Sequence, residues 1–235
     1  MTTRKRISVI AVLMTLAAGV ISPAAEAAAS RYITISSQGS VKVVPDAVRI
    51  NATATTVAAT SKEALAATSK TAAAVRTALK NSKIDNKDIA TQSVTVYPEY
   101  KYSNDGSSTL IGYRGSQSFT ITVRAADTAG TVVDSLVAAG GDNLQINGAT
   151  PFILDSTQSL EAARSAAVKS AKAKATSYAK LMGVKLGKIN YLIENSAPTN
   201  YTPVMATAKS ETDATVIDLG QQDVTISVTV QWSLL

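Results

Sequence analysis

The sequence of 235 residues contains no cysteine and no histidine. Without cysteine there are no disulfides, and there is no thiol to carry a lipid behind an export signal, so the core must be held by packing alone. Without histidine the commonest general base and the commonest transition-metal ligand are missing. These absences exclude Ser-His-Asp and Cys-His catalytic sites and histidine-rich metal sites.

Long apolar segments are almost absent as well. The one uncharged apolar run, Ile7 to Ile21, follows a basic start and precedes small residues in an Ala-x-Ala pattern. This order is typical of a secretory signal peptide, and the run is short for a membrane span of ~20 residues. We therefore expect a signal peptide over residues 1–29, cleaved after Ala27 or Ala29, and a periplasmic or secreted product; an uncleaved anchor is the alternative. No second segment of membrane length follows, so no transmembrane segment is expected after cleavage.

Charge of one sign is only in mild excess. The whole chain has 23 basic and 17 acidic residues, a formal net charge of +6. Removal of residues 1–29 takes away three basic residues and one acidic residue, which leaves 20 and 16 and a net charge of +4. Aromatic residues make up 5% of the chain, and it has no glycine-rich nucleotide loop. We therefore expect no nucleic-acid partner and no cofactor.

What is present is an alternation of strand and helix patterns. Residues 32–57 are expected to start as a strand, turn near Gly39 and continue as a long strand, with Pro45 at an edge, a bulge or a strand start. Residues 60–83 are expected to form a helix, in which Thr60 and Glu63 have the spacing of a capping box. The face of this helix that packs on a sheet is expected to consist of Leu65, Thr68, Ala72, Val75 and Leu79.

The rest of the chain continues this pattern. Residues 88–102 and 110–125 are expected to form a hairpin across the turn cluster SNDGSS. Its first strand places five residues on one side: Val94, Val96, Pro98, Tyr100 and Tyr102. Further elements are expected in this order: a short helix capped by Asp127, a strand over 143–155, a helix from Ser156 to Met182 capped by Asp155 or Ser156 and closed by Gly183, and strands over 185–195 and 223–235. The sequence predicts an α+β fold, an antiparallel or mixed sheet with helices packed on one face.

The helix over 156–182 is rich in alanine and lysine, which permits two functions. Its packed face is expected to contain Leu160, Ala163, Ala167, Ala171, Tyr178 and Leu181. On another side lie Lys169, Lys172 and Lys180. A scaffold helix with solvated lysines is the favoured interpretation, because charge on one helix face is usually solvated. The alternative is contact of these three lysines with an anionic lipid or cell-wall polymer.

Carboxylates provide a third candidate chemistry. Asp46, Asp88 and Asp155 have the functional groups for a carboxylate-based hydrolase, but each adjoins a turn or helix start, where aspartate usually caps an end. The clusters SNDGSS and GGDN offer oxygen ligands without the alternating spacing of a calcium loop. We therefore assign no catalytic, metal-binding or cofactor-binding residue.

Six segments, in order along residues 31–235, resemble the SIMPL-domain family, which includes bacterial periplasmic immunogenic proteins. They are GSVKVVPDAVRI, KDIATQSVTVYPEY, GYRGSQSFTITVR, INGATPFILD, EAARSAAVKSAKAKATSYAKLMGVKLGK and QDVTISVTVQW. The resemblance implies an exported α+β domain without established catalytic residues or cofactor. It further implies an association with the cell envelope and with oxidative-stress tolerance, and, for some members, ring-like homo-oligomers. The chain departs from the family at VIDLG (216–220), where relatives carry a run of the type Pro-Ile-x-Pro-Gly.

Together these observations predict a SIMPL-like domain over 30–235 behind the signal peptide. The expected function is that of a non-catalytic cell-envelope protein, a homo-oligomer or a binder of an envelope protein, linked through the family resemblance to oxidative-stress tolerance. After loss of the signal only Met182 and Met205 remain as methionines, too few for a scavenger. Binding of an anionic lipid or polymer is the alternative function.

Overall fold

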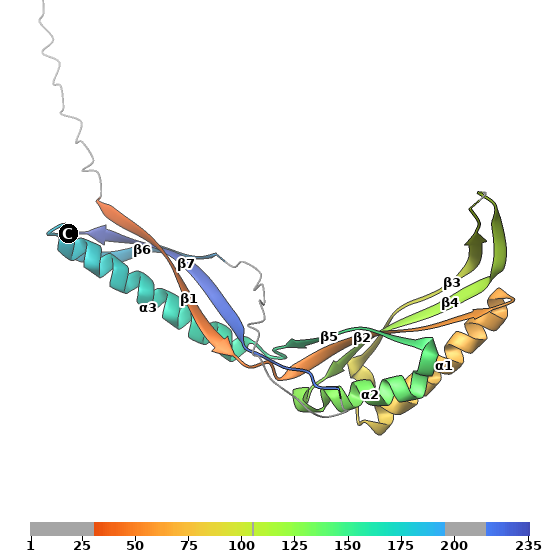
Figure 1. Cartoon of the computed structure of the whole chain (residues 1–235). Coiled ribbons are helices and arrows are strands. Elements are labelled where there is room, and N and C mark those ends of the chain that lie inside the picture. Colours follow the sequence, from red (N-terminus) through yellow and green to blue (C-terminus); the bar gives the residue numbers. More distant parts are fainter. Residues whose placement is uncertain (1–30, 105, 196–214) are drawn as a thin grey trace, which may run out of the picture.

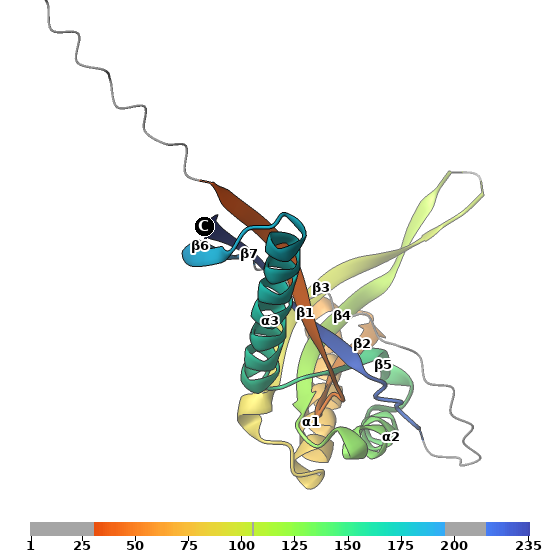
Figure 2. The ribbon, with the colours of Figure 1, turned by 90° about the vertical axis from the view of Figure 1, so that its left-hand side faces the viewer.

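The computed structural model describes residues 31–104, 106–195 and 215–235. The chain forms an elongated, bent molecule in which two antiparallel sheets follow one another end to end, each with helices on one face (Figure 1; Figure 2). The α+β class and the antiparallel pairing are confirmed, while the division of the strands into two sheets is a feature that alternation along the sequence does not reveal. No helix in the described part of the chain has the length and apolar character needed to cross a membrane.

The four-stranded sheet has the strand order β3-β4-β2-β5. Its strands are β2 (Ala47–Ala58), β3 (Ile89–Tyr102), β4 (Ser108–Val123) and β5 (Leu144–Phe152). Two helices cover one face: α1 (Ser61–Asn81) and α2 (Ala129–Gly140). Short 3₁₀ helices lie at Asn86–Asp88, Ala126–Thr128 and Gly141–Asn143. The hairpin of β3 and β4 is present as expected.

The three-stranded sheet has the order β1-β7-β6 and unites the two ends of the described chain. Its strands are β1 (Tyr32–Val43), β6 (Leu186–Asn195) and β7 (Gln222–Leu234), and α3 (Thr157–Leu181) covers one face. The expected alternation in the last strand is confirmed, because β7 buries every second side chain: Val224, Ile226, Val228, Val230 and Trp232. A central strand with one helix-covered face produces this period of two.

Small residues bring α3 close to β1. The helix is buried along a column of alanines at every fourth position: Ala163, Ala167, Ala171, Ala175 and Ala179. Gly39 lies under this column of alanines. Strand β1 continues through Gly39 without a turn, so the turn predicted near this residue is wrong. A Cβ atom at residue 39 would overlap the backbone nitrogen of Ala167 and the carbonyl oxygen of Ala163. This glycine therefore serves close packing instead of a turn.

The two sheets are joined by segments that cross between them side by side. Pro45 is buried in the short break between β1 and β2, which confirms that it precedes a strand start. The backbone N–H of Leu154 donates to the Asp46 carboxylate over 2.8 Å, which ties the β1–β2 crossing to the β5–α3 crossing. Gln222, at the start of β7, donates to the carbonyl of Pro151 over 2.9 Å. The junction is thus held by backbone and side-chain hydrogen bonds between crossings.

The VIDLG segment belongs to a strap, residues 215–220, that lies against the four-stranded sheet's helix layer before the chain enters β7. Thr215 donates its hydroxyl to Asp134 of α2 over 2.6 Å. The carbonyl oxygen of Thr215 lies so close to Gly130 that a Cβ atom at residue 130 would overlap it. Ile217 and Leu219 pack against the core under α1 and α2. Apolar contacts therefore fix this segment without the prolines of the family pattern.

Helix starts were predicted with mixed success. The capping box of Thr60 and Glu63 is confirmed, with both reciprocal hydrogen bonds at 3.2 Å. Gly183, at φ 69°, follows α3 in the left-handed conformation expected there. The cap predicted at Asp127 is wrong, because α2 begins at Ala129 without a side-chain cap. Leu65, predicted in the buried face of α1, is 41% exposed, and Ala64 takes its place there.

Gly39→Ala should test the close contact between β1 and α3. We expect the free energy of unfolding to fall by about 1–3 kcal/mol, because the added methyl group meets helix backbone that cannot move aside locally. Gly148→Ala is the matched control, since a Cβ atom there meets nothing within 4 Å, and it should change stability by no more than about 1 kcal/mol. Urea unfolding of the three proteins measures both effects. Equal stabilities of the two variants would contradict the packing role of Gly39.

Candidate interaction surfaces

The three lysines predicted as an anionic contact lie on the exposed part of α3. Lys169, Lys172 and Lys180 are all exposed, and none of them takes part in an ion pair within the described residues. The basic residue of α3 that is engaged is Arg164, which donates to Glu194 of β6 over 3.0 Å. The lysines are therefore available to solvent or to an anionic partner, and their role stays a prediction.

The three carboxylates considered for hydrolysis each have a structural partner. Asp46 accepts the N–H of Leu154, and Asp155 accepts the N–H of Thr157 over 2.9 Å at the start of α3. Hydrogen bonds from Thr157 hold the pKa of Asp155 below its usual range. Of the two predicted caps, Ser156 is the N-cap residue of α3, but its side chain makes no capping hydrogen bond. Asp155 lies one residue before the N-cap position. Among the described residues there is no cluster of three or more acids that would hold a metal ion.

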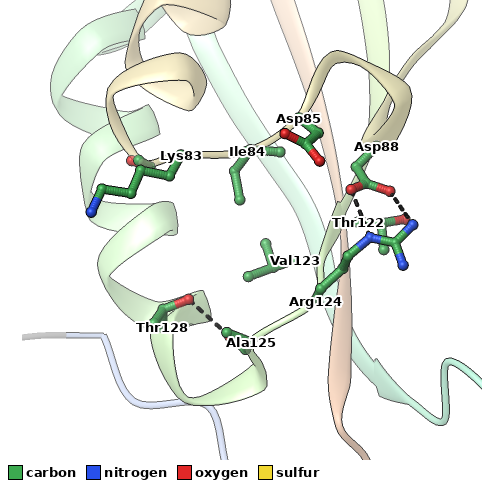
Figure 3. A pocket seen from close by; sticks show the side chains of 10 residues that line it. Lys83, Ile84, Asp85, Asp88, Thr122, Val123, Arg124, Ala125 and Thr128 are labelled. Atoms are coloured by element: carbon green, nitrogen blue, oxygen red, sulfur yellow. Dashed lines mark hydrogen bonds and ion pairs between the residues drawn. The ribbon is translucent and has the colours of Figure 1, made fainter.

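Asp88 belongs to a bidentate ion pair at the rim of a pocket of about 280 Å³ (Figure 3). Arg124 donates to both of its carboxylate oxygens over 2.8 Å, and these hydrogen bonds lower the pKa of Asp88. The pocket is lined by residues of two segments, 82–88 and 122–128. The side chains of Ile84, from the first segment, and Val123, from the second, point into the space between them (Figure 3). The Asp88 carboxylate is therefore occupied in joining these two segments.

The far ends of β3 and β4 form an uncovered arm. Tyr113 is the last β4 residue paired with β2, so residues 99–102 and 108–112 pair only with one another. We call these residues the arm, and Figure 1 shows it extending beyond the N-terminal end of α1. Its large side chains are well exposed: Tyr100 at 44%, Tyr102 at 78%, Leu110 at 47% and Ile111 at 55%. At its base Arg114 donates to both oxygens of Glu99 over 2.7 and 2.6 Å, which lowers the pKa of Glu99.

A second exposed apolar surface lies at the opposite end of the molecule. Tyr32, Tyr178, Leu181 and Met182 form this patch, which we call the helix end, with exposed fractions of 58%, 52%, 79% and 53%. A groove of about 380 Å³ adjoins it, lined by Tyr32, Ile33, Thr34, Ile35, Tyr178, Met182 and Leu234. Tyr178 and Leu181 were predicted in the buried face of α3, which is wrong. A column of every fourth residue turns about 40° per step around a helix, so by the last turn the buried face has moved to Ala175 and Ala179.

Strand β6 exposes apolar side chains along an edge of the three-stranded sheet. Ile189, Tyr191, Leu192 and Ile193 are between 39% and 57% exposed. Two register shifts interrupt its pairing with β7, and such irregularity is one way in which edge strands avoid unwanted pairing. The sequence predicted β6 as a strand, but its exposure was missed, although three consecutive residues in it, Tyr191, Leu192 and Ile193, depart from strict alternation.

The molecule is an elongated α+β protein of two antiparallel sheets with apolar surfaces exposed at its ends. A profile of the SIMPL family, described as Protein of unknown function (DUF541), matches residues 33–232. The chain therefore belongs to the SIMPL family, as its segments indicated. The predicted signal peptide, its cleavage positions and Met205 lie outside the described residues.

Curated relatives share this extent. The chain is 29% identical over 179 residues to the 26 kDa periplasmic immunogenic protein of Brucella melitensis biotype 1, covering 73% of this chain and 70% of that protein. It is 30% identical over 196 residues to the Uncharacterized protein YggE of Edwardsiella ictaluri, covering 80% and 79%. With YggE of Escherichia coli strain K12 it shares 28% identity over 181 residues, covering 74% and 71%.

The ion pair of Asp88 should contribute stability that depends on pH. Its folded-state pKa lies below the unfolded value of about 3.9, so the contribution is complete above that pH and is lost as pH falls through the folded pKa. We expect Asp88→Asn to be less stable than the original protein at pH 7, and the difference between the two unfolding curves in urea to shrink as pH falls below about 3.9. Asp85→Asn on the same loop is the control and should change little, because Asp85 makes only an exposed pair with Lys87. A difference that stayed constant from pH 7 to pH 3 would argue against this role.

Proposed function

We propose that this protein is a non-catalytic cell-envelope protein that acts through self-assembly or through binding of an envelope partner. In this proposal residues 1–29 are a signal peptide, residues 30–235 form the SIMPL-like domain, and the mature product is periplasmic or secreted. The Brucella relatives are named periplasmic immunogenic proteins, which supports the location. The basic start and apolar run of the first residues support export.

The observation that carries the proposal is the exposed apolar side chains at the two ends of the molecule. The arm and the helix end each present four large apolar or aromatic residues at exposed fractions of 44% or more. Contiguous apolar patches of this kind on an exported protein usually mark surfaces that another protein covers. Edge strand β6 adds a third surface of similar character.

A non-catalytic role is supported by the state of the acidic groups. Asp46 and Asp155 accept backbone hydrogen bonds, and Asp88 is held by a bidentate arginine. A hydrolase needs one carboxylate free to move a proton and another free to attack or to activate water. In the described structure these three acids serve instead to tie segments together.

The link to oxidative-stress tolerance comes from the family resemblance alone, and we propose that it is indirect. Met182 is exposed at the helix end and is the one methionine of the described chain. A single thioether has little scavenging capacity. An effect on envelope integrity, through assembly or partner binding, requires no redox chemistry from this chain.

Self-assembly should be visible in the mass of the mature protein in solution. We expect light scattering coupled to size exclusion to report a species larger than the monomer at micromolar concentration, because exposed apolar side chains at the two ends gain stability when another copy covers them. The fraction of protein present as monomer should rise on dilution. A monomer at every concentration tested would remove self-assembly and leave only partner binding.

Binding of an anionic lipid or polymer is the second candidate function, and the exposure of Lys169, Lys172 and Lys180 favours it. We expect retention on vesicles of anionic lipid at low salt, weakened by roughly two orders of magnitude when all three are changed to glutamine. The matched control changes the exposed α1 lysines Lys62, Lys70 and Lys80 to glutamine. Equal loss in both triple variants would indicate a diffuse charge effect, and absence of retention at low salt would remove the idea.

A further inference from the structure

We propose that the helix-free face of the three-stranded sheet binds a linear strand of N-acetylated amino sugars, a polymer that combines hydroxyl groups with uncharged acetamide groups. This inference rests on the proposed envelope location and on neither self-assembly nor the three lysines of α3. Helix α3 lies on one side of β1, β7 and β6, and the other side carries no described helix (Figure 1). We call that other side the open face.

The open face carries short, neutral, polar side chains. On β1 every residue of this face from Thr34 to Ser40 is serine, threonine or glutamine, and on β7 the same holds from Thr225 to Gln231. The residues between them alternate to the side that α3 covers. A charged pair, Lys42 opposite Asp223, follows only at the end near the junction. Solvated surfaces usually mix acids and bases, so this face suits a neutral polar ligand better than an ionic one.

Hydrogen bonds across the open face orient its polar groups. Ser36 and Thr229 share one over 3.0 Å, and Asn195 of β6 donates to Thr229 over 3.0 Å. Gln231 donates to Thr34 over 3.1 Å. A hydroxyl has one donor and two acceptor sites, and an amide has two donors and an acceptor oxygen. Each of these groups therefore keeps hydrogen-bonding capacity for the hydroxyl and amide groups of a sugar strand.

Strand β6 adds an aromatic and apolar margin to the open face. Tyr191 lies opposite Gln231 and Ile193 opposite Thr229, at exposed fractions of 39% and 52%. A tyrosine ring joins an apolar face, on which a sugar ring stacks, to a polar hydroxyl. Ile193 and Asn195 are neighbours on the same side of the strand, because they are two residues apart. An apolar side chain beside an amide matches the methyl and amide groups of an acetamide.

The open face also has the space for a linear chain. A groove of about 520 Å³ includes five side chains in its lining: Ser36, Gln38, Asn195 and Ser227 of this face and Lys174 of α3. From Thr34 to Ser40 the face is about 20 Å long, and its three strands span about 10 Å. This long and shallow form suits an extended strand of sugars. The sheet of the OB fold binds oligosaccharides on a face in a comparable way.

Two double variants and one single variant test the site with chitohexaose, a linear hexamer of N-acetylglucosamine. The open-face variant carries Tyr191→Ala and Asn195→Ala. The matched control carries Tyr97→Ala and Gln92→Ala, an exposed tyrosine and an exposed amide on β3 of the other sheet. Lys174→Gln removes the charged residue of the groove lining. All these positions are exposed, and circular dichroism melting should report a folded protein in each case. Calorimetric titration of the mature proteins at low and high salt then measures the affinity.

We expect the open-face variant to bind chitohexaose about tenfold more weakly than the original protein, because it loses a stacking ring and an amide. The control and Lys174→Gln should bind as the original protein does. Affinity should be equal at low and high salt, since a neutral ligand has no charge to screen. Cellohexaose, in which hydroxyls replace the acetamide groups, should bind more weakly.

Four results would overturn the proposal. They are absence of binding by the original protein, equal loss in the open-face variant and the control, loss in Lys174→Gln together with sensitivity to salt, and equal affinity for cellohexaose. The third of these indicates a site for an anion, and the fourth indicates a site that does not recognise the acetamide group. None of them alters the mass measured by light scattering, so failure of this inference and failure of self-assembly are distinguishable.

Discussion

The pairing of the first described strand with the last is the constraint on which the rest of the structure depends. β1 and β7 are aligned over their full lengths, and the hydrogen bond between Ser36 and Thr229 joins residues 193 positions apart. The four-stranded sheet is therefore held as an insertion between the two halves of the three-stranded sheet. Closing so long a loop has an entropic cost, which the central, buried strand β7 and the hydrogen bonds of the junction offset. The two ends of the molecule are thereby placed far apart.

Close packing by small residues determines which large residues remain outside. An alanine column and Gly39 bring α3 against β1 without large side chains between them. Some of the aromatic and long aliphatic residues remain exposed at the last turn of α3, on β6 and on the arm. In a protein without disulfides these exposed groups are not needed for the core, and burial by a partner is the one way in which their apolar surface contributes stability.

The acidic groups tie segments of the fold together. Asp46 joins two crossings between the sheets, Asp134 holds the strap, and Asp88 and Glu99 each form a bidentate pair with an arginine. Charged hydrogen bonds of this kind position segments, and their carboxylates are occupied in doing so.

The amino-acid sequence by itself determined the class of fold, most strand and helix positions, the capping box of α1 and the family, because local periodicity and end signals depend on neighbours a few residues away. It also identified the side of β3 that carries Tyr100 and Tyr102. Only the tertiary structure decided that the strands divide into two sheets and that these tyrosines, with Tyr178 and Leu181, are exposed. The physical reason is that exposure depends on where a helix ends relative to the strand it covers, and that relation is set by contacts between segments distant in the chain.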